Sequence, residues 1–296
     1  MKNGVLPICK PEGISSARVV KFVKKFSCAK KAGHMGTLDP FATGLLLCGI
    51  NKGTRISRFL LNSSKRYKAK ICLGVETDTY DVTGTVLKKS DGLHNLSNDK
   101  IFETVNSFQG KQSQIPPAFS ALKHKGKPLY EYARRGQSIT KPARDIEIFE
   151  ILIEKIEVPF VHIDVFCSKG TYIRTIAHDI GKKLGCGAHL ASLIRTETSG
   201  FTLDKAVELD DLGKMEHSAI MDKIIPLADA LSFLPSQSVD TKLENKIKFG
   251  QKIGLDDGLL PCDDFLRIIT NTGELAAIVE YDKNHGDFKY SCVFLN

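Results

Sequence analysis

Asp39 is the carboxylate whose surroundings in the sequence single it out for chemistry. Asp39 and Glu12 are the only acids among the first 70 residues, which also hold 15 Lys and Arg. Proline favours the first position of a helix, so Asp39 could cap a helix that begins at Pro40. Alternatively, Asp39 is a carboxylate held at a backbone-fixed position in a basic groove. The glycines of the surrounding segment 33–44 would then permit close approach of a ligand.

Two further side chains could act with this carboxylate, although their own patterns indicate ordinary roles. Tyr67 begins the alternating segment 67–74, which predicts a strand with Tyr67 on its apolar face. Taken alone, this indicates a core tyrosine. Arg174 lies off the apolar stripe of an amphipathic helix predicted over 172–184, where an arginine is usually solvated.

The positive charge is concentrated around these residues. The formal net charge is +8, but residues 1–70 alone carry +13, and segment 111–145 has eight Lys and Arg against two acids. An amphipathic helix predicted over 15–26, capped by Ser15 or Ser16, adds a basic face to the first region. Such a distribution is the electrostatic footprint of a nucleic-acid binder. The alternative is a surface that only keeps the protein in solution.

Several classes of protein are excluded by missing patterns. No two of the eight cysteines lie within ten residues, so CxxC-type spacing is absent and we expect reduced thiols. The sequence has no Walker A loop, GxGxxG or zinc deaminase signature, so we expect neither a metal nor a cofactor. The longest apolar stretch, 41–50, is interrupted by Thr and Gly, and the N-terminus does not resemble a signal peptide. We therefore expect a cytoplasmic protein without a membrane span.

The chain is expected to divide near Pro235. Segments 146–153 and 158–166 before it are β-rich, and the linker-like LPSQSVD surrounds it. Beyond it, FLRIITNTGELAAIVEYD predicts two strands with a turn around Asn271–Gly273. The expected domains are residues 1–235 and residues 236–296.

A series of motifs resembles, in order, those of the bacterial tRNA pseudouridine-55 synthase family, the TruB-type pseudouridine synthases. GHMGTLDPFATGLL, around Asp39, resembles the catalytic motif of that family. The other motifs are KPEGISS (10–16), KRYKAKICLGVETDTYDVTG (65–84), PPAFSALKHKGKPLYEYARRG (116–136) and CSKGTYIRTIAHDIGKKLGCGAHLASLIRT (167–196). The resemblance spans residues 5–203, about two-thirds of the chain.

The resemblance implies roles for three residues in the reaction. Asp39 matches the catalytic aspartate of the family, which attacks or stabilises the ribose or uracil while the C–N glycosidic bond breaks. Tyr67 matches the tyrosine that stacks on the target base and is a candidate base in proton removal. Arg174 matches the arginine that pairs with the catalytic carboxylate, and a nearby guanidinium favours the ionised acid.

The resemblance also implies substrate-binding roles for four further residues. Tyr172 and Leu193 match residues that line the uracil pocket. His34 matches the histidine that fills or supports the space left by the flipped nucleotide. Lys10 lies in the opening motif, and we assign it only a supporting role. Alone, His34 would indicate a loop residue and Leu193 a core leucine.

The fold implied by the resemblance is α+β. The pseudouridine synthase catalytic domain is expected to have a mixed, mostly antiparallel sheet with the active site in a basic cleft. Residues 236–296 resemble a small β-rich PUA-like domain, but they hold seven Lys and Arg against ten Asp and Glu, a net charge of −3. This charge is unfavourable for binding phosphates. We expect the segment to pack against the catalytic domain and to add little affinity for RNA.

The function implied is the isomerisation of uridine 55 in the T arm of tRNA to pseudouridine. We expect a cytosolic enzyme that binds the T-arm stem-loop as a monomer, without an obligate protein partner. One alternative is a non-catalytic tRNA-binding or tRNA-folding factor on the same scaffold. A glycosidase-like hydrolase would need a second carboxylate near Asp39, and the surrounding sequence offers only Glu12. The atom that Asp39 attacks and the group that removes the C5 proton stay open.

Overall fold

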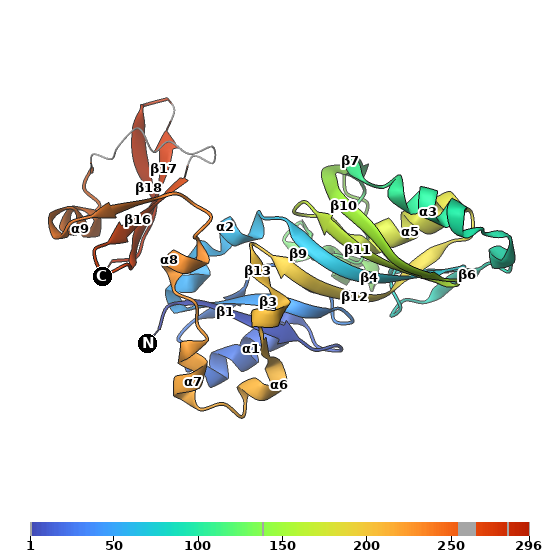
Figure 1. The fold of residues 1–296 in the computed structure, drawn as a ribbon, viewed down its shortest axis with the longest axis horizontal. Helices are drawn as coiled ribbons and strands as arrows, with labels where there is room; N and C mark the ends of the chain where they lie inside the picture. Colours follow the sequence, from blue (N-terminus) through green and yellow to red (C-terminus); the bar gives the residue numbers. More distant parts are fainter. Residues whose placement is uncertain (1, 138, 254–264, 283, 296) are drawn as a thin grey trace.

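A large mixed sheet forms the centre of the molecule (Figure 1). The computed structural model describes residues 2–137, 139–253, 265–282 and 284–295, and within them ten strands belong to this sheet. Its main path, in spatial order, is β14 (Val207–Glu208), β1 (Gly4–Lys10), β3 (Thr43–Ile50), β12 (Ala188–Thr198), β4 (Lys65–Leu73), β11 (Phe160–Cys167), β10 (Arg144–Glu157) and β7 (Gly110–Gln114). Off this path are β2 (Ala32–His34), paired with β3, and β13 (Phe201–Thr202), paired with β12.

The pairing in this sheet is mostly antiparallel. β1 is parallel to β14, and β3 is parallel to β12. The other neighbouring pairs of the sheet are antiparallel. The predicted α+β class with a mixed, mostly antiparallel sheet is therefore confirmed. The β-rich segments expected around 146–153 and 158–166 are β10 and β11.

Strand β4 lies between β12 and β11 and confirms the predicted alternation. Tyr67, Ala69, Ile71 and Leu73 are buried, whereas the intervening side chains are partly or fully exposed. The strand begins earlier than expected, at Lys65. Because side chains of a strand alternate between two faces, the same face carries core residues and Tyr67.

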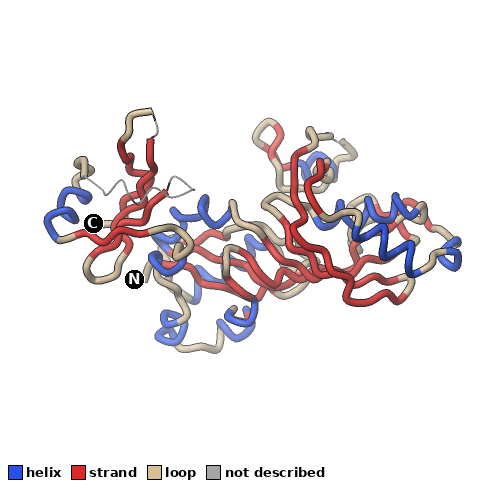
Figure 2. The backbone as a smooth tube through the Cα atoms, turned by 45° about the horizontal axis from the view of Figure 1, so that its top comes forward, coloured by secondary structure: helices blue, strands red, loops and turns tan. Residues whose placement is uncertain are grey.

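The three longest helices of the described chain pack against this sheet. Helix α5 (Ile173–Leu184) contacts β12, and α3 (Asn98–Asn106) contacts both α5 and β10. Figure 2 shows both helices along one face of the sheet. Helix α1 (Ser16–Phe26) contacts β2 and β3, and the Ser15 hydroxyl caps it by accepting a hydrogen bond from the Arg18 N–H. Both predicted amphipathic helices are thus confirmed.

The segment around Asp39 is a loop, and no helix begins at Pro40. Residues 35–42 are irregular, and the chain then enters β3 at Thr43. The interpretation of Asp39 as a helix cap is therefore wrong. The backbone beyond Pro40 forms strand hydrogen bonds because β3 is inserted between β1 and β12 in the sheet.

Short elements connect the strands of the large sheet or lead from it to the C-terminal sheet. Two of them are two-stranded hairpins, β5–β6 and β8–β9. These elements are η1 (Asn51–Ile56), α2 (Ser57–Leu61), β5 (Val75–Thr77), β6 (Val86–Lys89), η2 (Gly92–Asn95), β8 (Lys123–His124), β9 (Lys127–Pro128), α4 (Leu129–Ala133), η3 (Leu203–Lys205), α6 (Leu209–Leu212), α7 (His217–Asp222) and α8 (Leu227–Ala230).

A separate four-stranded sheet follows at the C-terminal end (Figure 1). Its elements are β15 (Ser236–Val239), α9 (Thr241–Lys248), β16 (Phe265–Thr270), β17 (Leu275–Asp282) and β18 (Asp287–Val293). The turn predicted around residues 271–273 joins β16 to β17, as expected. The predicted small β-rich unit is therefore confirmed.

An apolar cluster joins the two sheets. Leu275, Ile278 and Phe294 belong to the same buried cluster as Val5 and Leu47 of the large sheet. The expectation that the C-terminal unit packs against the catalytic domain is confirmed. The domain boundary at residue 235 stays a prediction.

Two further observations concern the cysteines and the helices. Seven cysteines lie in the described part of the chain and have free thiols; Cys262 lies outside the described residues. Among the helices that the structure describes, none is long and apolar enough to cross a membrane.

Candidate active site

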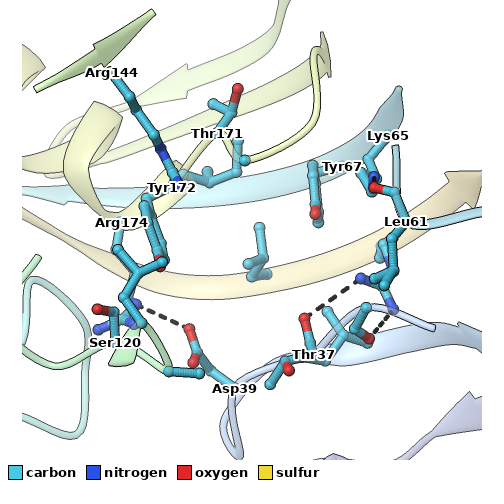
Figure 3. Close-up of a pocket in the computed structure, with 18 residues that line it drawn as sticks. Thr37, Asp39, Leu61, Lys65, Tyr67, Ser120, Arg144, Thr171, Tyr172 and Arg174 are labelled. Carbon is cyan, nitrogen blue, oxygen red and sulfur yellow. Dashed lines mark hydrogen bonds and ion pairs between the residues drawn. The ribbon is translucent and has the colours of Figure 1, made fainter. Parts of the chain in front are cut away.

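A pocket of about 310 Å³ lies where the Asp39 loop, β4, β12 and the start of α5 meet (Figure 3). Five residues singled out from the sequence line it: Asp39, Tyr67, Tyr172, Arg174 and Leu193. They come from four separate segments of the chain, so only the tertiary fold brings them together. His34 and Lys10 are not among the lining residues.

Asp39 and Arg174 form an ion pair on the wall of this pocket. Arg174 Nε lies 2.9 Å from Asp39 Oδ2 (Figure 3). The Arg174 side chain is only 4% exposed, whereas that of Asp39 is 35% exposed and open to the pocket. The expectation of a solvated arginine is therefore wrong, because the Asp39 loop and the chain around Thr79 cover this side of α5.

The rest of the Arg174 guanidinium is held by the protein itself. Nη1 donates to the Thr79 carbonyl at 2.9 Å, and Nη2 donates to the Phe119 carbonyl at 2.7 Å. The Asp81 carboxylate lies 3.4 Å from Nη1 and is 5% exposed. These contacts fix the plane of the guanidinium, and Nε lies beside the Asp39 carboxylate.

Asp81 is a functional residue that the sequence reasoning missed. It belongs to the turn-rich ETDTYDVTG segment, where acids and threonines ordinarily indicate only a turn. Its Oδ1 accepts hydrogen bonds from the Thr79 and Thr83 hydroxyls at 2.8 and 2.6 Å. The fold therefore supplies a second carboxylate near Asp39, contrary to the expectation that only Glu12 was available. Asp81 does not line the pocket and is occupied by these donors and by Arg174.

The protonation of Asp39 reflects opposing influences. Burial raises the pKa of Asp39 above its ordinary value, and the Asp81 charge adds to this effect. The Arg174 guanidinium and the Lys10 ammonium act against it by favouring the carboxylate. The Arg174 guanidinium thus favours a negative charge on Asp39 in a site that is partly shielded from water.

Tyr67, Leu193 and Tyr172 form the apolar and aromatic walls. Tyr67 and Leu193 are buried on neighbouring strands β4 and β12. Burial raises the pKa of Tyr67, so its phenol is protonated at neutral pH. Buried Gln114 forms two hydrogen bonds with the backbone of Tyr172. The Gln114 side-chain oxygen accepts from the Tyr172 N–H at 2.8 Å, and the Gln114 side-chain nitrogen donates to the Tyr172 carbonyl at 3.1 Å.

Arg195 is a second buried arginine of the pocket that the sequence reasoning missed. It is 1% exposed, and its Nε donates to the Leu45 carbonyl at 2.7 Å. Its Nη2 donates to the Gly36 carbonyl at 3.2 Å, which ties the loop carrying Asp39 to β12. Gly44 permits this approach, since a Cβ there would lie 2.4 Å from the Arg195 carbonyl oxygen. The close approach at Gly44 is thus to protein backbone and not, as expected, to a ligand.

Lys10 and His34 lie outside the lining of the pocket. Lys10 is fully buried, and its ammonium donates to the carbonyls of Pro11, Ile14 and Pro40 at 2.8 to 3.1 Å. Burial lowers the pKa of Lys10 to about 8. His34 lies on β2, and burial lowers its pKa. Lys10 therefore anchors the chain directly after Asp39.

The charged lining is strongly positive. Lys65, Arg144, Arg174 and Arg195 line the pocket, and Asp39 is the only acid among its lining residues within the described chain. The Arg144 guanidinium lies over the Tyr172 ring at 4.6 Å. Lys65 and Arg195 could have been found by the period of two, because each lies two residues from a predicted pocket residue on the same strand.

The arrangement suits one kind of chemistry. One oriented carboxylate faces a pocket with apolar and aromatic walls, which can enclose a planar ring. The surrounding cations favour a ligand that carries negative charge, such as a nucleotide within a polynucleotide. The site therefore has the parts needed to act on the base of a nucleic acid.

The fold is similar to that of chains in solved Cbf5-containing complexes. The chain matches a chain of the crystal structure of a Cbf5-Nop10-Gar1 complex with a TM-score of 0.74 and 26% identity. The match covers 99% of this chain and 85% of that chain. A second match, to an archaeal box H/ACA sRNP Nop10-Cbf5 complex, has a TM-score of 0.72.

The chain belongs to the TruB family of pseudouridylate synthases and is therefore an isomerase. The family model described as TruB family pseudouridylate synthase (N terminal domain) matches residues 24–173. The model for the tRNA pseudouridylate synthase B C-terminal domain matches residues 174–232. The resemblance stated from the motifs is thus confirmed.

Curated relatives agree with this assignment. The chain is 41% identical over 269 residues to tRNA pseudouridine synthase B of Clostridium tetani, covering 90% of this chain and 91% of the relative. It is 48% identical over 214 residues to the protein of the same name from Bordetella avium, covering 72% and 88%.

Proposed function

We propose that this protein converts uridine 55 in the T arm of tRNA to pseudouridine. The observation that carries the proposal is the Asp39–Arg174 ion pair, which faces a basic pocket with aromatic walls. The names of the relatives, tRNA pseudouridine synthase B, support tRNA as the substrate. The choice of uridine 55 rests on the motif resemblance.

The reaction exchanges one bond of the uracil for another. The C1′–N1 glycosidic bond breaks, the uracil rotates within the pocket, and C5 bonds to C1′. The proton leaves C5, and N1 ends with a proton, so atoms and electrons balance without an added reactant. Asp39 acts on the ribose or uracil as a nucleophile or as an electrostatic stabiliser. Arg174 favours the ionised form of Asp39 that either role requires.

The pocket walls retain the base while it is detached. The uridine first leaves its stack, which costs a few kcal/mol. Stacking on an aromatic ring is worth about 1–3 kcal/mol and offsets part of this cost. We assign stacking to Tyr67, and enclosure of the uracil to Tyr172 and Leu193. Tyr67 is also the candidate acceptor of the C5 proton, and its raised pKa means that this role requires transient loss of the phenol proton.

Lys10 and His34 are assigned to substrate positioning. Lys10 holds the Pro40 carbonyl at 3.1 Å and so sets the backbone next to Asp39. His34 supports the space left by the flipped nucleotide. The cations of the pocket and of residues 1–70 attract the RNA backbone, so tRNA affinity should fall steeply with salt. Binding that does not depend on salt would contradict this electrostatic role.

We further infer that the protein works in the cytoplasm as a monomer without an obligate protein partner. One chain supplies all parts of the described pocket, which supports action as a single subunit. Sedimentation of the protein with and without tRNA would check this. A complex with two subunits per tRNA would contradict it.

Nucleoside analysis tests the proposed reaction. Unmodified tRNA is incubated with wild type and with Asp39→Asn, digested and separated into nucleosides. We expect pseudouridine from wild type and none from the variant, and a tRNA with cytidine at position 55 should stay unmodified. No product with intact tRNA binding would indicate a non-catalytic binding or folding factor. Free uracil would indicate a hydrolase, which the occupied Asp81 carboxylate does not favour.

A further inference from the structure

Tyr80 adopts a backbone conformation that is unusual for a residue with a side chain. Its φ is 62°, in the left-handed region, which is costly for a bulky residue unless the surroundings stabilise it. Tyr80 lies in the turn between β5 and β6, directly between Thr79 and Asp81. Both of these neighbours contact Arg174.

The Tyr80 side chain is stacked on helix α5. Its ring lies 4.0 Å from the His178 ring, with an angle of 15° between the planes. His178 follows Arg174 by four residues, so the two side chains leave the same face of the helix one turn apart. The stack therefore joins the turn to the helix that carries Arg174.

The backbone of the turn is held on its other side by β12. The Tyr80 carbonyl accepts from the Leu190 N–H at 2.9 Å, and the Val82 N–H donates to the Leu190 carbonyl at 3.0 Å. These bonds fix the turn to the sheet but do not reach α5. Contact with the helix is made by the Arg174 guanidinium itself and by the Tyr80–His178 stack.

We propose that Tyr80 and His178 are positioning residues for the Asp39–Arg174 pair. By setting the turn against α5, the stack places the Thr79 carbonyl and the Asp81 carboxylate where they orient the guanidinium. The left-handed backbone of Tyr80 turns its ring toward His178 and the flanking acceptors toward Arg174. This inference rests on the proposed pseudouridine formation and adds two residues that act through Arg174.

Variants of Tyr80 distinguish the effect of losing the aromatic ring from the effect of unfolding the protein. Tyr80→Gly removes the ring and also removes the backbone strain, since glycine adopts positive φ without steric cost. This relief of strain offsets part of the stabilisation lost with the ring, so the variant should still fold. We expect its kcat to fall about 10- to 100-fold with KM within about twofold, because a small misorientation of a catalytic group has effects of this size. Tyr80→Phe keeps the ring and should restore kcat.

His178 tests the other half of the stack. His178→Ala should lower kcat by a similar factor, and the double variant Tyr80→Gly with His178→Ala should be no worse than either single variant. Such non-additivity is expected for two residues that act as one unit. The matched control is Phe102→Ala, which removes an exposed aromatic ring from α3, away from the pocket, and should leave kcat unchanged.

The acid limb of the kcat profile provides a readout that a purely structural role would not move. Arg174, Asp81 and Lys10 are the charged groups that act on Asp39. A loosened Arg174 favours the Asp39 carboxylate less, so the limb should shift to higher pH in Tyr80→Gly. Wild-type kcat and an unshifted limb in folded Tyr80→Gly would overturn the inference. If wild type itself forms no pseudouridine, the proposed function is wrong. The positioning role of Tyr80 and His178 is then wrong with it, because there is no reaction for them to support.

Discussion

The surroundings of the pocket and the C-terminal sheet of this protein use charge in different ways. Around the pocket of the large sheet, Asp81, Arg174, Arg195 and Lys10 are buried and hold one another or backbone carbonyls. In the C-terminal sheet, ion pairs such as Lys252–Asp287 lie on the surface. That sheet is joined to the rest of the molecule by apolar residues, including Ile278.

We relate the buried charges to the reaction and the apolar C-terminal contacts to the stability of the fold. Buried charges are costly to remove from water, and breaking one partner leaves the other uncompensated. We infer that the cluster is retained here because it orients Asp39, the proposed reacting group. The C-terminal sheet stabilises the fold by apolar burial, so changes there should alter unfolding and leave the chemistry intact.

Among changes that leave Asp39 itself intact, the largest effect is expected for Arg174→Lys. The planar Arg174 guanidinium contacts Asp39, two carbonyls and Asp81 at the same time. Lysine keeps the charge, but its single ammonium group cannot make all of these contacts. We expect kcat to fall about 10²- to 10³-fold, as for loss of an oriented electrostatic contact in other enzymes. Single-turnover pseudouridine formation would measure this. A loss confined to KM would mean that Arg174 only binds substrate.

Ile278→Ala should have the opposite profile. Ile278 is fully buried in the cluster between the sheets, so removing its side chain should destabilise the protein by about 2–5 kcal/mol. Urea unfolding would give the free energy, and kcat at a temperature where the variant is folded should match wild type. A drop in kcat of the folded variant would show that the C-terminal sheet positions the site.

Asp39→Asn should stabilise the protein while it abolishes activity. Because burial raises the pKa of Asp39, the folded state prefers the protonated acid, and ionisation at neutral pH costs stability. The variant should therefore be more stable than wild type at pH 7, by less than the loss in Ile278→Ala. The difference should shrink as pH falls through the raised pKa of Asp39.

The raised pKa of Asp39 also sets the pH at which wild-type activity should fall on the acid side. If the ionised carboxylate reacts, kcat should fall as pH drops through the raised pKa, above the ordinary aspartate value of about 3.9. A limb at or below the ordinary value would mean that Arg174 outweighs burial. Equal stability of wild type and Asp39→Asn at all pH values would contradict the burial cost.

The smallest effect is expected for Lys252→Gln. Its ion pair with Asp287 joins side chains that are 90% and 36% exposed, where water screens the attraction. The melting temperature should change by no more than about 1–2 °C. The affinity for tRNA should also stay unchanged, because the C-terminal unit is net acidic. A clear loss of tRNA affinity would show that this sheet contacts RNA.

The elements around the pocket were well predicted where side-chain periodicity is strong. The alternation from Tyr67 predicted β4, and the apolar stripe predicted α5 with Arg174 at its start. These patterns are local, because each strand or helix must bury one face. The helix pattern did not indicate the burial of Arg174, since it cannot tell that other segments cover its polar side. The pairing of Arg174 with Asp39 was implied by the motif resemblance.

Residues whose partners come from distant segments were not found. Asp81 and Arg195 act on Arg174 and on the Asp39 loop, which are more than 90 residues away from them in the chain. The helix expected at Pro40 failed for the same reason, since strand pairing of β3 overrode a local preference of proline. Motif resemblance identified Asp39, but it did not indicate what holds the loop in place.

From local patterns and motifs we could predict the periodic elements, the concentration of positive charge near Asp39 and the family to which the chain belongs. The folded molecule was needed to see that Arg174 is buried, that Asp81 and two carbonyls orient it, and that Lys10 and Arg195 anchor the Asp39 loop. The physical reason is that the cost of burying a charge depends on the partners around it. Those partners are assembled only when the sheet, the turn after β5 and helix α5 come together.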